Sequence, residues 1–260
     1  MRLSRVAGLS LALTLAAGCR GQPKCHGELD HDDLLRLQEL SETGKYPCKE
    51  HLEPAIEVTR EGVTLSGRPV APAAELPTGP APKRIHGLFS ALKANREIWK
   101  QVNPGRPFDA HPNVHLDGQS AFVVGAGALM TVAYAGYPQA TVRAGNVSFE
   151  MLYAVPGPPT PDEEAKPTTE LWVSERAGRG YSALLREGSV VRAASPELRF
   201  EGVPGWIALE CASRADPCAK VLVLDLSGDF IVAASLVQSI GGGPGFRTGP
   251  PLLRFAMPGS

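Results

Sequence analysis

Apolar and polar residues alternate along residues 55–70, AIEVTREGVTLSGRPV, and this period of two predicts a β-hairpin. After a proline-rich connection the period becomes helical, and residues 84–102 place six apolar side chains on one stripe: Ile85, Leu88, Phe89, Leu92, Trp99 and Val102. Further on, the pattern predicts a short strand at 113–118, an apolar helix at 120–137 that ends near Gly136, and strands at 140–145 and 147–155.

A similar order of patterns follows residues 156–169, whose prolines and acidic residues predict a linker. The second half predicts a hairpin at 170–191, helices at 203–213 and 229–240, and strands at 220–228 and 251–257. The clearest internal echo pairs VHLDG at 114–118 with LDLSG at 224–228, each before an apolar helix. Two tandem copies of one domain would explain this echo, and so would two unrelated units sharing a common strand–turn–helix.

These patterns predict an α+β protein of two small tandem α/β-sandwich units, at 54–155 and 170–260, each with the order hairpin, helix, strand, helix, strand. Hydrophobic residues make up 43% of the 260 residues, which is enough for a sizeable core. The formal net charge is −1 and the chain has no basic run, so we expect no nucleic-acid partner.

The first 19 residues, MRLSRVAGLSLALTLAAGC, have the layout of a secretory signal peptide. Arg2 and Arg5 precede a short apolar segment, and small residues lead directly to Cys19. This ending resembles the lipobox of bacterial lipoproteins, which implies cleavage after residue 18 and a lipid on Cys19. The alternative is a plain secretion signal. If Cys19 carries a lipid, residues 19–53 form a lipidated leader. We expect a short helix within residues 30–46, capped by Asp30 or Asp32.

Four further cysteines remain in the chain: Cys25, Cys48, Cys211 and Cys218. An even number in an exported protein suggests disulfides, and the local pairings Cys25–Cys48 and Cys211–Cys218 are preferred among three possible connectivities. The rival interpretation is a metal-binding leader, because His26, His31 and His51 accompany the first two cysteines. Their spacing matches no zinc pattern, so no metal site is predicted.

The densest cluster of chemically active side chains lies between residues 108 and 117, where Asp109, His111, His115 and Asp117 occur close together. Such groups serve acid–base catalysis or metal binding, and they also occur in solvated loops and at strand ends. No G-x-S-x-G and no phosphate-binding G-x-x-x-x-G-K-[ST] is present. We therefore predict no catalytic residue and no cofactor. Trp99, Trp172 and Trp206 stand in apolar patterns that are typical of core positions.

Residues 54–155 resemble the periplasmic domain of the ExbD/TolR family of biopolymer-transport proteins. The resemblance lies in the hairpin EVTREGVTLSGRPVA and in the helix that ends in AYAGYPQATVRAG, and the second unit matches only around LVLDLSGDFIVAASLVQSIGG. Members of that family carry a transmembrane helix with an aspartate used in proton-driven energy transduction. The apolar segment of this chain has no acidic residue, so the resemblance implies only the soluble role of docking to envelope proteins or to the cell wall.

Together these features predict a lipoprotein on the periplasmic side of the inner or outer membrane, held in the cell envelope by its N-terminal lipid. The expected function is a non-catalytic binding or adaptor module for envelope proteins or peptidoglycan. The alternative is a periplasmic hydrolase or metal-binding protein that uses the Asp109–Asp117 cluster.

Overall fold

A computed structural model describes residues 23–137, 139–153, 168–176, 180–212, 218–241 and 252–256. The chain divides into two compact units, residues 1–47 and 48–260. In the first unit, helix α1 spans His31–Glu42. The Asp30 carboxylate accepts a hydrogen bond of 2.8 Å from the Asp33 N–H, which caps the helix and confirms the first of the two predicted caps.

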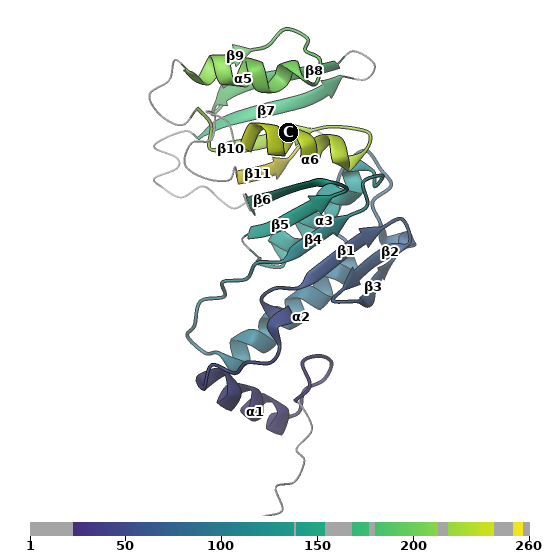
Figure 1. Cartoon of the computed structure of the whole chain (residues 1–260), viewed down its shortest axis with the longest axis vertical. Helices are drawn as coiled ribbons and strands as arrows, with labels where there is room; N and C mark the ends of the chain where they lie inside the picture. Colours follow the sequence, from purple (N-terminus) through teal and green to yellow (C-terminus); the bar gives the residue numbers. More distant parts are fainter. Residues whose placement is uncertain are drawn as a thin grey trace, which may run out of the picture. The chain divides into compact units, whose positions relative to one another are not determined.

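The second unit is built on one mixed sheet of eleven strands, in the order β3-β2-β1-β4-β5-β6-β11-β10-β7-β8-β9 (Figure 1). Its first six strands are β1 Ala55–Thr59, β2 Gly62–Leu65, β3 Arg68–Pro72, β4 Asn113–Leu116, β5 Gln139–Ala144 and β6 Val147–Tyr153. The other five are β7 Thr169–Arg176, β8 Gly180–Glu187, β9 Val190–Ala194, β10 Val221–Asp225 and β11 Leu252–Phe255. The predicted hairpins and short strands are confirmed.

Within the described residues of this unit, four α-helices accompany the sheet: α2 His86–Val102, α3 Phe122–Tyr134, α5 Gly202–Ala212 and α6 Phe230–Gly241. Two short 3₁₀ helices, η1 Lys49–His51 and η2 Ala73–Glu75, lie in connections. All four predicted helices of the two halves are confirmed. None of the helices in the described part of the chain is long and apolar enough to cross a membrane.

The connectivity of the first half recurs in the second. Strands β1, β2 and β3 form an antiparallel meander, and a helix then leads to β4, which lies parallel to β1. Strands β7, β8 and β9 form the same meander, and α5 leads to β10, which lies parallel to β7. Even the irregularity in pairing recurs, at Val63/Thr64 between β2 and β3 and at Leu185/Arg186 between β8 and β9.

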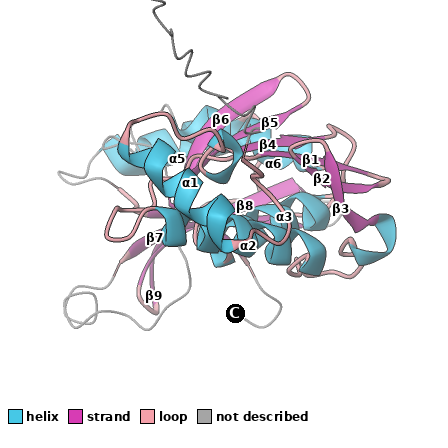
Figure 2. Ribbon diagram, turned by 90° about the horizontal axis from the view of Figure 1, so that it is seen from below, coloured by secondary structure: helices cyan, strands magenta, loops and turns pink. Residues whose placement is uncertain are grey.

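The helices form one layer, in which neighbours pack in the order α2, α3, α6, α5. Figure 2 shows α2 and α3 side by side. In Figure 1 this layer lies behind β1 and β4 but in front of β10. A twist of about 20° per strand, accumulated over the sheet, accounts for this change of side in the view. The helix layer and one face of the sheet enclose a single apolar core.

The two halves meet at β6, which pairs antiparallel with β5 on one side and parallel with β11 on the other. Beside this junction, the Phe122 N–H donates to the Gly228 carbonyl at 2.7 Å, and the Phe230 N–H donates to the Ser120 carbonyl at 2.8 Å. Each of α3 and α6 thus begins on a carbonyl from the loop before the other. Phe122 and Phe230 are the first residues of α3 and α6, and they lie 108 residues apart. The similar segments VHLDG and LDLSG lie 110 residues apart. The sequence match is therefore shifted by two residues from the structural match.

Of the predicted fold class, only the coarser statement is confirmed: the chain forms a mixed α/β domain with one mixed sheet. The tandem halves do not form separate sheets, because β11 inserts between β6 of the first half and β10 of the second. The boundaries at 54–155, 156–169 and 170–260 remain predictions.

Candidate functional site

The face of the sheet opposite the helix layer carries most of its polar side chains, and we call it the open face. Along β4 the burial alternates: Val114 and Leu116 are buried toward the helices, while Asn113 and His115 are half-buried on the open face. The same alternation along β5 and β6 places Arg143, Ser148 and Glu150 on the open face, where they are exposed. Strands β4, β5 and β6 therefore present polar side chains together on the open face.

Pairing across the strands aligns five of these side chains in one row. Glu57 of β1 lies opposite Thr64 of β2 and His115 of β4, His115 lies opposite Arg143 of β5, and Arg143 lies opposite Ser148 of β6. The Thr64 hydroxyl donates to the Glu57 carboxylate at 3.2 Å. Directly opposed residues on one face of a sheet are close neighbours. We call Thr64, Glu57, His115, Arg143 and Ser148 the polar row.

The sequence cluster between Asp109 and Asp117 does not converge on one point. His111 Nε2 lies 2.8 Å from the hydroxyl of Thr141, and Asp109 accepts a hydrogen bond of 3.2 Å from the Gln139 side-chain amide. Asp117 instead accepts a bond from the N–H of Gln119, in the turn after β4.

His115 joins the polar row, four residues from His111, and at the rise of a strand this separation is about 13 Å. Within the described ranges, no three histidine, cysteine, aspartate or glutamate side chains are placed to hold a metal ion. The four cluster residues therefore have separate local partners rather than one shared centre.

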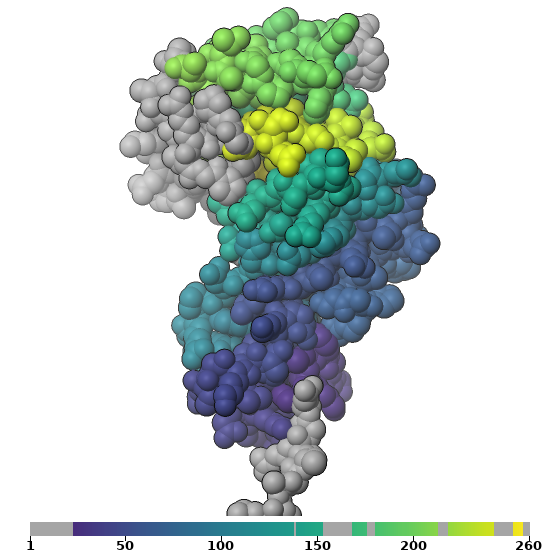
Figure 3. Space-filling view, viewed as in Figure 1, coloured from purple at the N-terminus to yellow at the C-terminus, as the bar shows by residue number. Residues whose placement is uncertain are grey.

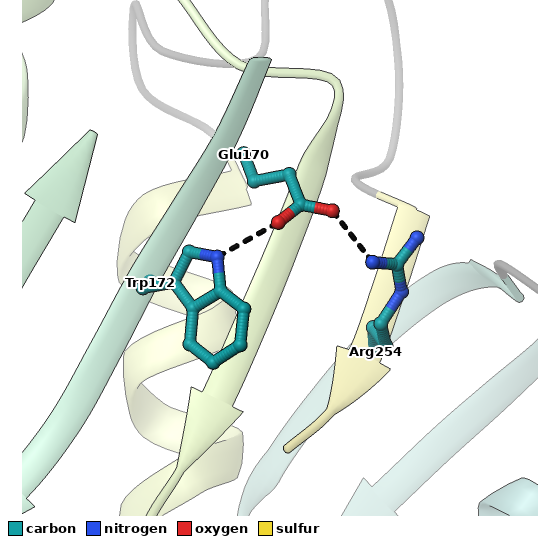
Figure 4. A network of polar contacts seen from close by, with 3 residues as sticks. All are labelled: Glu170, Trp172 and Arg254. Carbon is teal, nitrogen blue, oxygen red and sulfur yellow. Dashed lines mark hydrogen bonds and ion pairs between the residues drawn. The ribbon is translucent and has the colours of Figure 1, made fainter. Parts of the chain in front are cut away.

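A second polar group lies on the open face of the other half and was not predicted from the sequence. The Glu170 carboxylate of β7 accepts a hydrogen bond of 2.8 Å from the Trp172 indole N–H and forms an ion pair of 2.5 Å with Arg254 of β11 (Figure 4). The Arg186 guanidinium of β8 lies 5.0 Å from the centre of the Trp172 ring, within cation–π range. We call Glu170, Trp172, Arg186 and Arg254 the Glu170 cluster.

This cluster spans a strand that contributes no polar group to it. Strand β10 lies between β7 and β11, and its Val221 and Val223 are 3% and 0% exposed although they face away from the helix layer. Val223 is paired with both Trp172 and Arg254, so the ion pair between Glu170 and Arg254 passes over β10 (Figure 4). The cluster thus accounts for the burial of apolar side chains on the open face.

The tryptophan prediction is therefore only partly correct. Trp99 is buried in the core, at 6% exposed, and Trp206 of α5 packs partly against it. Trp172 is half-buried on the open face, with its N–H bonded to Glu170. An alternating strand pattern around Trp172 would have placed it opposite Leu171 and Val173, away from the core, but the apolar character of the segment suggested burial.

Two disulfides are present, Cys25–Cys48 and Cys211–Cys218. Cys48, Cys211 and Cys218 are buried. The second bond joins the last turn of α5 to the segment before β10. Cys19 lies outside the described residues, so its lipidation remains a prediction.

A buried tyrosine stands apart from both open-face groups. The Tyr137 hydroxyl donates to the carbonyls of His51 at 3.2 Å and Leu92 at 3.4 Å, and its ring meets Phe108 edge-on at 5.0 Å. Burial raises the pKa of Tyr137 far above its ordinary value, against a smaller lowering by Arg96. Tyr137 is therefore a neutral hydrogen-bond donor that ties α2 to the segment before β1.

The pKa of a second tyrosine is also shifted. The pKa of Tyr181 on β8 is raised, first by burial and then by the charges of Glu175 and Glu201. The Glu175 carboxylate itself accepts hydrogen bonds from the N–H and hydroxyl of Ser227, both at 2.8 Å. These contacts join β7 to the loop after β10.

Comparison with known proteins adds no relative: no family model, no curated protein and no solved structure matches this chain.

Proposed function

We propose that this protein is a lipid-anchored component of the cell envelope that acts as a non-catalytic binding or adaptor module. The observation that carries the proposal is the open face, where strands β1, β2, β4, β5 and β6 present the polar row on one side of the sheet. A row of charged and hydrogen-bonding side chains along a sheet face suits contact with a protein or with peptidoglycan, whereas small substrates are usually enclosed in a concave pocket.

The proposal includes a tandem pair of ExbD/TolR-like periplasmic units. The repeated order of meander, helix, strand, helix and strand supports a duplication, and so does the matching irregularity in the two meanders. The resemblance of residues 54–155 to that family supports the choice of unit. An envelope location on the periplasmic side follows from the signal-like segment ending at Cys19, and the two disulfides fit an oxidising compartment.

The anchor is tested by metabolic labelling with an alkyne fatty acid, followed by purification of the full chain. We expect the label on the wild-type protein and its loss in Cys19→Ser. Retention of the label in this variant would contradict lipidation at Cys19.

The binding role is tested by photo-crosslinking in cells from a benzoylphenylalanine placed at Arg143, in the middle of the polar row. The matched control places the same group at Lys93, an exposed residue of α2 on the helix layer. We expect a reproducible envelope protein or peptidoglycan fragment to be captured from position 143 alone. Equal capture from both positions, or none from position 143 in an abundant and lipidated protein, would contradict the proposal.

A further inference from the structure

The two ends of the eleven-stranded sheet differ in how they are protected. Strand β9 pairs with β8 on one side, and no described strand pairs with its other side. Its Val190 and Val191 are each 49% exposed. An edge strand with unpaired backbone groups and exposed β-branched residues is a template for further strand pairing. Figure 3 shows the green part of the molecule that contains β8, β9 and α5 at the surface.

Strand β3, which occupies the equivalent place in the first half, is protected in two ways. It contains Pro69 and Pro72, and proline offers no N–H to an added strand. Helix α2 also packs against β3 so closely that a side chain on Gly87 would overlap the Val70 carbonyl. Strand β9 has no proline, and α5 packs against β8 and α6. Within the part of the chain that the structure describes, one edge of the sheet is therefore blocked and the equivalent edge is open.

An unpaired charge on an edge strand usually discourages the pairing of a further strand, but β9 carries no such charge among its described ion pairs. Arg192 is the only charged residue of the strand, and its guanidinium forms an ion pair of 2.8 Å with Glu187 of β8. Because the pair is neutral overall, an approaching strand meets compensated charge and two valines. Charged residues are commonly depleted from the centre of an interface, and the exposed part of β9 follows this composition.

The molecule already contains one junction between two units in a continuous sheet, formed by the parallel pairing of β6 and β11. Its two halves share one sheet through β6, and helices α3 and α6 meet on the same side of that junction. At β6 and β11, two units are thus joined edge to edge with their helices on one side of a common sheet. A second copy of the chain offers the same edge, and pairing about a two-fold axis matches each open backbone group with its counterpart.

We infer that β9 is a self-association edge, at which two copies of this chain pair antiparallel through Val190–Ala194 and continue one sheet across both. The two-fold axis passes at Val191, because an axis at Arg192 would place two like charges directly opposite each other. Around Val191, Arg192 of each copy lies beside Val190 of the other. This association does not depend on the lipid anchor or on the ligand of the open face.

The first test is the mass of the purified, detergent-solubilised full chain, measured over a range of concentrations by analytical ultracentrifugation with detergent-matched density. We expect a dimer in equilibrium with monomer. Val191→Lys places two ammonium groups on the axis and should raise the dissociation constant at least about tenfold. The control is Leu209→Ser, which removes an exposed apolar residue of α5, 76% exposed, away from the edge, and should leave the dimer unchanged.

The second test is a cross-link in membranes that contain the intact protein. With Val191→Cys, mild oxidation should yield a covalent dimer on non-reducing gels, because directly opposed residues lie within disulfide reach. Leu209→Cys should yield none. A monomeric wild-type chain at all concentrations, an unchanged dimer in a folded Val191→Lys variant, or equal cross-linking at both positions would each overturn the inference.

Discussion

The rings of Phe122 and Phe230 stack in the core with centroids 6.2 Å apart and planes inclined by 15°. They stand at the first positions of α3 and α6, where each backbone N–H bonds to the loop before the other helix. Phe255 of β11 meets Phe122 edge-on at 5.8 Å. The halves are therefore held together by aromatic packing and reciprocal backbone bonds beside the β6–β11 pairing.

Gly125 tests this packing, because a Cβ at this position would overlap the buried ring of Phe230. Gly125→Ala should lower the free energy of unfolding by about 1–3 kcal/mol. The control is Gly205→Ala in α5, where a Cβ would meet open space, and where alanine should stabilise by about 0.5–1 kcal/mol. Urea unfolding of both variants checks the prediction, and a change of the same sign in both would contradict it.

Arg254 tests the Glu170 cluster. Arg254→Met leaves the Glu170 carboxylate, whose side chain is 17% exposed, with the Trp172 N–H but without its ion-pair partner. We expect a loss of about 1–3 kcal/mol in unfolding free energy. Arg192→Met breaks a pair whose side chains are 50% and 36% exposed, and it should cost at most about 1 kcal/mol. An equal effect of the two variants in thermal unfolding would show that the cluster contributes no more than a surface pair.

The burial of Tyr137 predicts that the stability of the protein falls at alkaline pH. Burial raises its pKa in the folded protein, so the folded state disfavours the ionised form. The resulting stability is fully present below about pH 10, the ordinary tyrosine value, and is lost as the pH rises above it.

Tyr137→Phe should cost about 1 kcal/mol at pH 7 through the lost hydrogen bonds to His51 and Leu92. The variant should then lose less stability than the wild type between pH 9 and pH 11. Parallel unfolding curves for the two proteins across this range would contradict the assignment, since Tyr181 titrates in both.

The Cys211–Cys218 disulfide closes a short loop between α5 and β10. Replacing both cysteines by serine should lower the free energy of unfolding by about 2–3 kcal/mol through the larger entropy of the unfolded chain. Thermal unfolding with and without a reductant measures the effect. If the reductant lowers the stability of the double variant as strongly as that of the wild type, the stability lost on reduction belongs to the other disulfide.

Local structure was predictable from the sequence because its causes are local. The alternation of apolar residues around Ile56 and Val63 sets the first hairpin, and the stripe through Leu88 and Leu92 sets α2. Gly125 and Gly127 lie in the helix that the apolar pattern predicts, and their small size permits close packing against Phe230 and against the backbone of Lys83.

Long-range pairing was not predictable in this way. Nothing in the local pattern around Leu252 and Leu253 shows that β11 pairs with β6 of the other half. The Glu170 cluster depends on that placement, because Arg254 reaches Glu170 only when β11, β10 and β7 lie in this order. The cluster of Asp109 and Asp117 shows the converse case, since nearness in sequence did not bring the two carboxylates to one site.

The position of β11 also determines when the sheet can be completed. It is the last strand in chain order, yet it lies in the middle of the sheet, between β6 and β10. During synthesis or export from the N-terminus, β6 therefore keeps one side unpaired until Leu252–Phe255 has emerged. Until then the six strands of the first half end at β6 in an unpaired edge, and this edge needs shielding from other strands.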